Sequence, residues 1–181
     1  MKSFTSLAII GLLLFACKLC SFTGTHGPSP GPTPTPQPLT YAGDLIRQQL
    51  GSFTLVKHLT REEMRKDTTG FRLTLINKSN DAGLGEYRSD TGKPVTLMVF
   101  SFASKEITSS VLAELEEDLR TSRHWRSITT GSTQHGKKLE GVRNDNGESQ
   151  GIVIWNNGYW LFTAFAEDIS VARSLFDSVG Y

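Results

Sequence analysis

Two cysteines near the start of the chain, Cys17 and Cys20, have the C-x-x-C spacing that many redox and metal sites use. A redox pair needs its reactive cysteine at the start of a helix, near a βαβ unit, where the thiolate is stabilised. This pair instead follows an apolar run and precedes a proline-rich stretch. Haem attachment needs a histidine directly after the second cysteine, and Ser21 stands there. The sequence therefore does not favour a chemical role for the pair.

Other residues with catalytic side chains are scattered along the chain. No cysteine follows Cys20, which excludes a thiolate nucleophile or thiolate metal site from the remainder. No G-x-S-x-G elbow occurs, and no H-E-x-x-H or similar spacing joins the histidines. An acidic cluster at 114–118 is interpreted as a solvated helix face rather than a metal site. The sequence predicts no cofactor and no metal, and it identifies no reaction.

An enzyme with a dispersed site is the alternative to a binding or structural role. Such an enzyme would bring His58, His124 or His135 together with an aspartate or glutamate in one cleft. Because nothing in the sequence joins these residues, we favour the binding or structural role.

Aromatic residues concentrate between positions 155 and 165. Alternation along a strand places most of them in a core. Trp155 and Tyr159 flank a turn, and large aromatic side chains are frequent anchors in binding surfaces. These two residues are therefore the candidates for a small ligand or partner patch.

The first sixteen residues predict an export signal. Lys2 supplies a positive start, and positions 7–17 form a run of eleven apolar or small residues. Such a run is too short to cross a bilayer, which takes about 20 apolar residues, but it suits the core of a signal peptide.

The segment Leu14-Phe15-Ala16-Cys17 resembles the lipobox of bacterial lipoproteins. The resemblance implies cleavage after Ala16, attachment of diacylglycerol to the Cys17 sulfur, and acylation of the new N-terminus by chains such as palmitate. It also implies an exported protein of the bacterial cell envelope, anchored to the outer or the cytoplasmic membrane. Cys20 is left as a bystander or a secondary acylation site. A plain secretory signal, cleaved without lipid attachment, is the alternative.

Residues 17–39 are predicted to form the lipidated N-terminus and a spacer. Six of the seven prolines alternate with other residues in "PSPGPTPTPQP" at 28–38. Alternating proline favours extended polyproline II, and at about 3.1 Å per residue the segment could reach roughly 70 Å. The partner expected for this part is the membrane, through the lipid anchor.

Residues 40–181 are predicted to be one folded domain with an unknown protein or small-molecule partner. Of the 19 basic residues, Lys2 and Lys18 precede this domain, which leaves 17 against 18 acidic residues. Nucleic-acid-binding domains are typically strongly basic, so we expect no nucleic-acid partner.

The domain's hydrophobic pattern predicts an α+β fold, a mainly antiparallel sheet packed by helices. Turns are expected at Asn146-Gly147 and at 156–158. The stretch "FRLTLIN" at 71–77 alternates as a strand does. The element order is also loosely similar to PsbP-like α/β/α sandwiches, which is the alternative fold. The expected helices are 42–50, 60–67, 104–120 and one from 168, and the expected strands are 53–58, 85–89, 95–102, 125–129, 138–143, 150–155 and 159–165.

Overall fold

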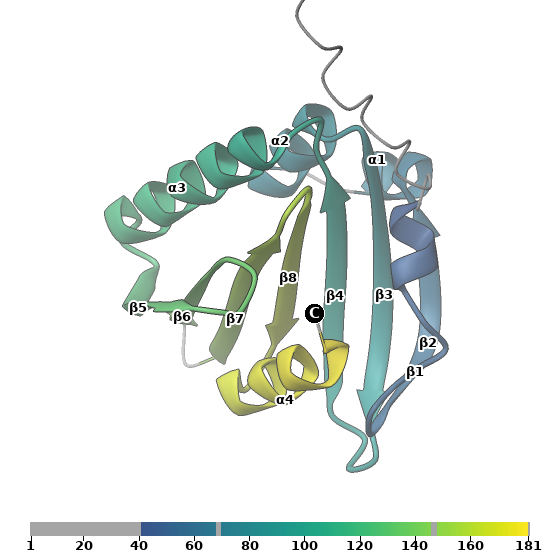
Figure 1. Cartoon of the computed structure of the whole chain (residues 1–181). Coiled ribbons are helices and arrows are strands. Elements are labelled where there is room, and N and C mark those ends of the chain that lie inside the picture. Colours follow the sequence, from purple (N-terminus) through teal and green to yellow (C-terminus); the bar gives the residue numbers. More distant parts are fainter. Residues whose placement is uncertain (1–40, 68–69, 146–147, 181) are drawn as a thin grey trace, which may run out of the picture. The chain divides into compact units, whose positions relative to one another are not determined.

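A computed structural model describes residues 41–67, 70–145 and 148–180 (Figure 1). The expected signal peptide, the spacer, Cys17 and the Asn146-Gly147 turn lie outside the described residues.

The described strands form one antiparallel sheet of eight, in the order β1-β2-β3-β4-β8-β7-β6-β5. After β4 the chain leaves the sheet through a long helix, enters again at the far edge, and returns strand by strand until β8 lies beside β4. The strands are β1 (Gln49–Leu50), β2 (Phe53–Thr60), β3 (Asp81–Ser89), β4 (Pro94–Ser101), β5 (Trp125–Ser132), β6 (Lys137–Asp145), β7 (Glu148–Asn157) and β8 (Trp160–Ala166).

Helices cover both faces of this sheet (Figure 1). The short 3-10 helix η1 and helix α4 pack on one face, and α1, α2 and α3 pack on the other. The two cores are separate because successive side chains of a strand point to opposite faces. This arrangement confirms the predicted α+β class. The helices are η1 (Ala42–Leu45), α1 (Arg61–Asp67), α2 (Phe71–Lys78), α3 (Lys105–Thr121) and α4 (Ile169–Val179).

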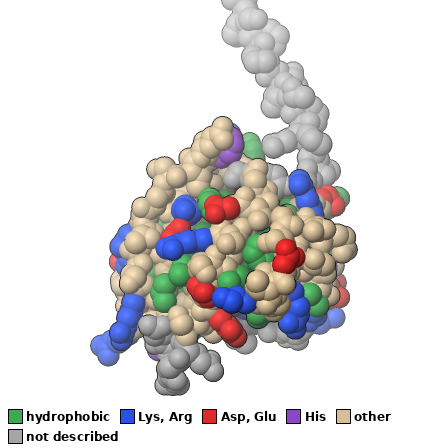
Figure 2. Space-filling view, turned by 90° about the horizontal axis from the view of Figure 1, so that it is seen from below, with side chains coloured by type: hydrophobic (Ala, Val, Ile, Leu, Met, Phe, Trp, Pro, Cys, Tyr) green, Lys and Arg blue, Asp and Glu red, His purple; other side chains and the backbone are tan. Residues whose placement is uncertain are grey.

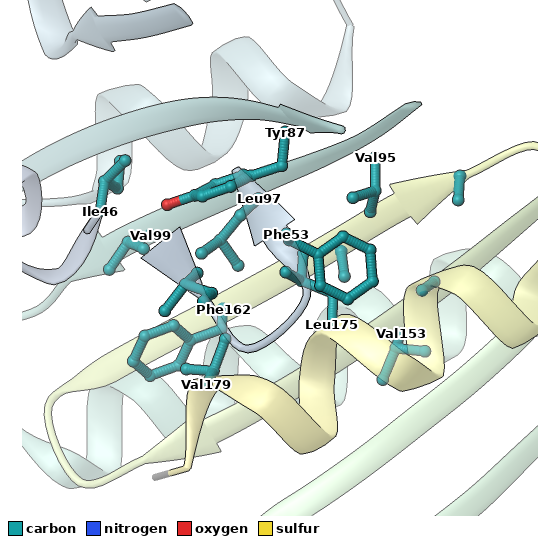
Figure 3. Packing of buried hydrophobic residues seen from close by; sticks show 14 of the residues in the cluster. Ile46, Phe53, Tyr87, Val95, Leu97, Val99, Val153, Phe162, Leu175 and Val179 are labelled. Atoms are coloured by element: carbon teal, nitrogen blue, oxygen red, sulfur yellow. The ribbon is translucent and has the colours of Figure 1, made fainter. Parts of the chain in front are cut away.

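Helix α4 closes one face of the sheet. Its N-cap is Asp168, whose side chain accepts a hydrogen bond from the Ser170 N–H at 2.8 Å. Figure 3 shows Leu175 and Val179 of this helix directed toward Phe162 and Leu97 of the sheet. The amphipathic pattern and the capping residue together explain why the predicted start of this helix is confirmed.

Two sequence predictions near the N-terminal side are wrong. The helix expected at 42–50 is only the single turn η1, and the chain then bends into β1. The Ala42 N–H is held by the Asp81 carboxylate at 2.8 Å, a contact between distant parts of the sequence. Gly51, the residue after the expected helix, supplies a positive φ of 55° to the β1–β2 turn.

The stretch "FRLTLIN" forms helix α2 rather than a strand. Leu75 and Ile76, which are neighbours in sequence, are both buried, which a strand with one covered face would not allow. Arg61 of α1 then satisfies the end of α2, donating to the Ile76 carbonyl at 2.9 Å and the Ser79 carbonyl at 2.8 Å. This tertiary cap could not be seen in the local pattern.

Glu116 of α3 fastens this helix to the sheet edge. Its carboxylate accepts hydrogen bonds from Lys137 of β6, from Arg120 at 2.8 Å and from Thr130 of β5 at 3.0 Å. The hydrogen bonds from Lys137 and Arg120 lower the pKa of Glu116 from 4.5 to about 2. One residue of the acidic cluster at 114–118 thus lies in a contact rather than on a solvated face.

We expect Glu116→Gln to make the free energy of unfolding less dependent on pH between about pH 4.5 and 2. A carboxylate whose pKa falls on folding contributes stability that is complete above about pH 4.5 and is lost as the pH falls to about 2. The measurement is the urea midpoint of unfolding at a series of pH values. The exposed neighbour Glu117→Gln is the control and should follow the wild-type profile. A Glu116→Gln profile parallel to wild type would contradict the role given to this contact.

Candidate functional site

The candidate ligand site is an open cavity of about 220 Å³ where α2 passes over the ends of β4 and β8. Arg72 comes from the first turn of α2, and Thr96, Phe165 and Gln150 come from β4, β8 and β7. We call this site the Arg72 cavity. Its described lining is completed by Pro94, Val95, Ala166 and Glu167.

The sheet register places the cavity's strand residues beside one another. Thr96 pairs with Phe165 across β4 and β8, and Phe165 pairs with Ile152 across β8 and β7. Gln150 lies two residues before Ile152 and therefore on the same face. Arg61, by binding the end of α2, holds the helix that carries Arg72. The site is thus built on strands and on a helix with an anchored end.

The Arg72 side chain lies over an aromatic ring. Its guanidinium carbon is 4.7 Å from the centroid of Phe165, within the range of a cation–π contact. The side chain is half-buried, and burial lowers the pKa of Arg72 from its ordinary value, although a guanidinium keeps its proton in proteins. Among the carboxylates whose side chains the structure describes, which leaves out those of Asp67, Asp145 and Glu148, none forms an ion pair with Arg72, even though Glu167 lines the same cavity.

This arrangement is suited to binding rather than to catalysis. The described lining has one cation, one carboxylate, a hydroxyl and an amide beside apolar side chains, and it contains no histidine or cysteine. A cavity with a few polar groups on a mostly apolar wall is the usual form of a small-molecule site.

Two other hollows are weaker candidates. One, of about 310 Å³, lies between the β1–β2 turn, the β3–β4 turn and the start of α4. Its hydroxyls already bond locally, with Ser89 and Thr91 2.9 Å apart and the Lys93 N–H 3.0 Å from Ser89. The other, of about 200 Å³, is a mainly apolar hollow under α3 beside Trp125.

Figure 2 views the molecule from the end at which α4 and the β3–β4 turn lie. Acidic and basic side chains are interspersed on this face, with apolar side chains between them. Lys93 and Asp168, 3.5 Å apart, are one such neighbouring pair. This face therefore carries no field of a single sign.

The predicted aromatic patch is not formed as expected. Trp155 is 1% exposed, stacked on Phe162 with ring centroids 5.0 Å apart and edge-on to Phe176 at the same distance. Tyr159 is half-buried in the β7–β8 turn, with the Lys105 amine 5.9 Å from its ring. Trp155 thus offers a ligand or partner no exposed surface, because alternation in β7 directs it under α4.

The three histidines considered for a dispersed site are not brought together. His58 lies on β2, while His124 directly precedes β5 and His135 lies in the β5–β6 turn. Five strands separate β2 from β5 in the sheet. Within 41–67, 70–145 and 148–180, no group of three or more His, Cys, Asp or Glu side chains is placed to hold a metal ion.

Sequence reasoning missed the Arg72 cavity. Arg72 falls in the stretch 71–77, whose alternation is typical of a strand, and Thr96, Gln150 and Phe165 are ordinary strand residues. The residues are far apart in the chain, and their spacing follows no motif. In the part of the chain that the structure describes, no helix is long and apolar enough to cross a membrane.

No protein-family model and no curated protein matches the chain. Among solved structures, a crystal structure of a GTP-binding regulator from Thermotoga maritima is a distant match, with 15% sequence identity and a TM-score of 0.43. The match covers 71% of this chain and 75% of that chain. A likeness this weak carries no inference about function. The lipoprotein signal and the likeness to PsbP-like sandwiches stay predictions.

Proposed function

We propose that this chain is an exported bacterial lipoprotein whose α+β domain binds a small ligand in the Arg72 cavity. The observation that carries the binding role is a half-buried guanidinium that lines a cavity and has no carboxylate partner among the side chains that the structure describes. Buried or half-buried charges are normally paired, so an unpaired one in a cavity marks a place for a ligand.

The export and anchoring part rests on the N-terminal sequence. Cys17 follows Ala16 and an apolar run, and six prolines separate it from the folded domain. Each acyl methylene buried in a bilayer contributes about 0.8 kcal/mol, so two or three chains hold a protein that one chain would release. A cysteine-free domain at the end of an extended spacer suits a binding module held clear of a membrane.

Replacing Cys17 with alanine is expected to abolish lipid attachment and release the protein from membranes. The measurement is the intact mass of the protein extracted from membranes, together with its distribution between membrane and soluble fractions. Cys20→Ala is the matched control, and we expect it to keep the lipid. Equal masses for wild type and Cys17→Ala, after correction for the substitution itself, would refute lipidation at Cys17.

The binding role is tested by an NMR titration of the full chain with small aromatic probes of different charge. We expect at least one probe to shift the backbone amide signals of Thr96, Gln150 and Phe165. If every probe leaves these signals in place at millimolar concentration, a purely structural role in the envelope is favoured instead.

A further inference from the structure

The charges of this domain show how unusual Arg72 is. Arg173 pairs with Glu140 at 2.7 Å, and Arg120 pairs with Glu116 at 2.8 Å, although both arginines are about half exposed. Arg72 is half-buried, and among the side chains that the structure describes its one partner is the Phe165 ring. A cation with less water around it and no ion pair to an acid favours an anionic partner more strongly than an exposed or paired cation does.

The Phe165 contact leaves the hydrogen-bonding capacity of Arg72 free. The guanidinium carbon lies over the ring, 4.7 Å from its centroid, and the ring carries no oxygen or nitrogen acceptor for the N–H donors. The five N–H donors of a guanidinium lie in its plane and point outward from the edge. Two parallel donors in this plane match the two oxygens of a carboxylate or phosphate group. The ring therefore fixes the guanidinium without using the donors that would bind an anion.

The other lining residues determine which uncharged part of an anionic ligand the cavity can accept. Pro94 and Phe165 are apolar, whereas Thr96 and Gln150 add neutral polar groups, and the Val95 side chain belongs to the core on the opposite face of the sheet. The volume of about 220 Å³ exceeds the cavity of about 150 Å³ that accommodates benzene in another protein. The space therefore suits one small ring or a short aliphatic chain together with a charged head.

Glu167 is the one described group in the lining that opposes an anion. Its side chain is exposed, so solvent and salt weaken its repulsion more than they weaken the attraction of the half-buried Arg72. Its presence has a testable consequence, because removing its charge should strengthen anion binding.

We infer that the ligand of the Arg72 cavity is a small amphiphilic organic anion, with its oxyanion head on Arg72 and its apolar body against Pro94 and the edge of Phe165. The inference rests on the proposed function, because it names the ligand class of the same site.

The test uses near-isosteric probes that differ in charge. Benzoate is the anion, benzamide the neutral probe and benzamidinium the cation, and acetate is an anion without the ring. Each is titrated into the full chain while the amide signals of Thr96, Gln150 and Phe165 are followed. We expect the dissociation constant of benzoate to be about tenfold or more below that of benzamide. This is the ratio expected when only benzoate forms a charge-assisted hydrogen bond with Arg72. Acetate should bind more weakly than benzoate, and phenyl phosphate shows which oxyanion head the site prefers.

Three variants test whether Arg72 and Glu167 determine the preference for benzoate. Arg72→Gln is expected to remove the preference for benzoate, and Glu167→Gln is expected to strengthen benzoate binding. Arg123→Gln makes the same exchange at an exposed arginine outside the cavity lining and should leave binding unchanged. The Glu167 variant keeps the test decisive even where Arg72→Gln perturbs the fold.

The outcomes separate the two claims. Benzamide or benzamidinium binding at the cavity as tightly as benzoate, or a benzoate preference that survives in Arg72→Gln, would overturn the anion inference while leaving the binding role in place. No shift with any probe would overturn both.

Discussion

Replacing Trp155 with alanine is expected to lower the free energy of unfolding by about 3–5 kcal/mol, the usual loss for a buried tryptophan. The side chain is 1% exposed and lies between Phe162 of β8 and Phe176 of α4, with both ring centroids 5.0 Å away. Alanine would leave a void between sheet and helix and remove the two aromatic contacts. Urea unfolding followed by circular dichroism measures the loss without relying on the tryptophan signal.

Trp155→Phe separates packing from hydrogen bonding at this position. The indole Nε1 is buried and has no hydrogen-bond partner within the described residues. Phenylalanine keeps an aromatic ring and removes an unsatisfied donor, so it should cost clearly less than alanine. Val56→Ala, at a side chain that is 60% exposed, is the control and should change stability by under about 0.5 kcal/mol. A loss below about 1 kcal/mol for Trp155→Ala would contradict this description of the core.

Gly151→Ala is expected to destabilise the domain by about 1–3 kcal/mol, the range for overpacking a filled core. A Cβ atom at position 151 of β7 would lie 2.4 Å from the Ile169 Cα and 2.6 Å from its backbone nitrogen. These are backbone atoms of the first turn of α4, so a side-chain rotation cannot relieve the clash and the helix must move. The measurements are the thermal unfolding midpoint and the hydrogen exchange of α4 amides.

The control for this substitution is another strand glycine. A Cβ at Gly131 of β5 would meet the Lys138 Cε at 3.8 Å, which is ordinary van der Waals contact. Gly131→Ala should therefore be neutral or slightly stabilising, because alanine restricts the unfolded chain. Equal midpoints for the two variants would show that α4 does not rest directly on β7.

The elements that were predicted well are those whose signals are local. The hairpin of β7 and β8 follows from Gly158, which supplies a positive φ of 61° in its turn. Helix α3 follows from the apolar stripe that includes Val111 and Leu115 and from its N-cap Ser104, which accepts the Ile107 N–H at 3.2 Å. Each signal lies within a few residues of the structure that it specifies.

The misread elements depend on distant partners. At the end of helix α2 the Ile76 carbonyl accepts a hydrogen bond from Arg61 of the preceding helix. At the start of η1 the Ala42 N–H donates to Asp81, 39 residues further along the chain. The Arg72 cavity depends on the same arrangement, because it needs α2 over β8 and the two strands flanking β8. A single sequence contains these residues but no pattern that pairs them. The candidate site could therefore not be predicted, whereas its α+β setting could.

The place of β8 has a consequence for the order in which this sheet can be completed. Its neighbour β4 carries Leu97, Met98, Val99 and Phe100, all fully buried, and β8 pairs with β4 along its whole length, from Val95–Ala166 to Ser101–Trp160. Every residue from 102 to 159 must be synthesised before that pairing can form. During this interval β4 presents an open edge with apolar side chains on both faces, the kind of strand that pairs with other chains. A ribosome, which delivers this chain from its N-terminus, therefore releases the central strand β4 before its partner β8 exists.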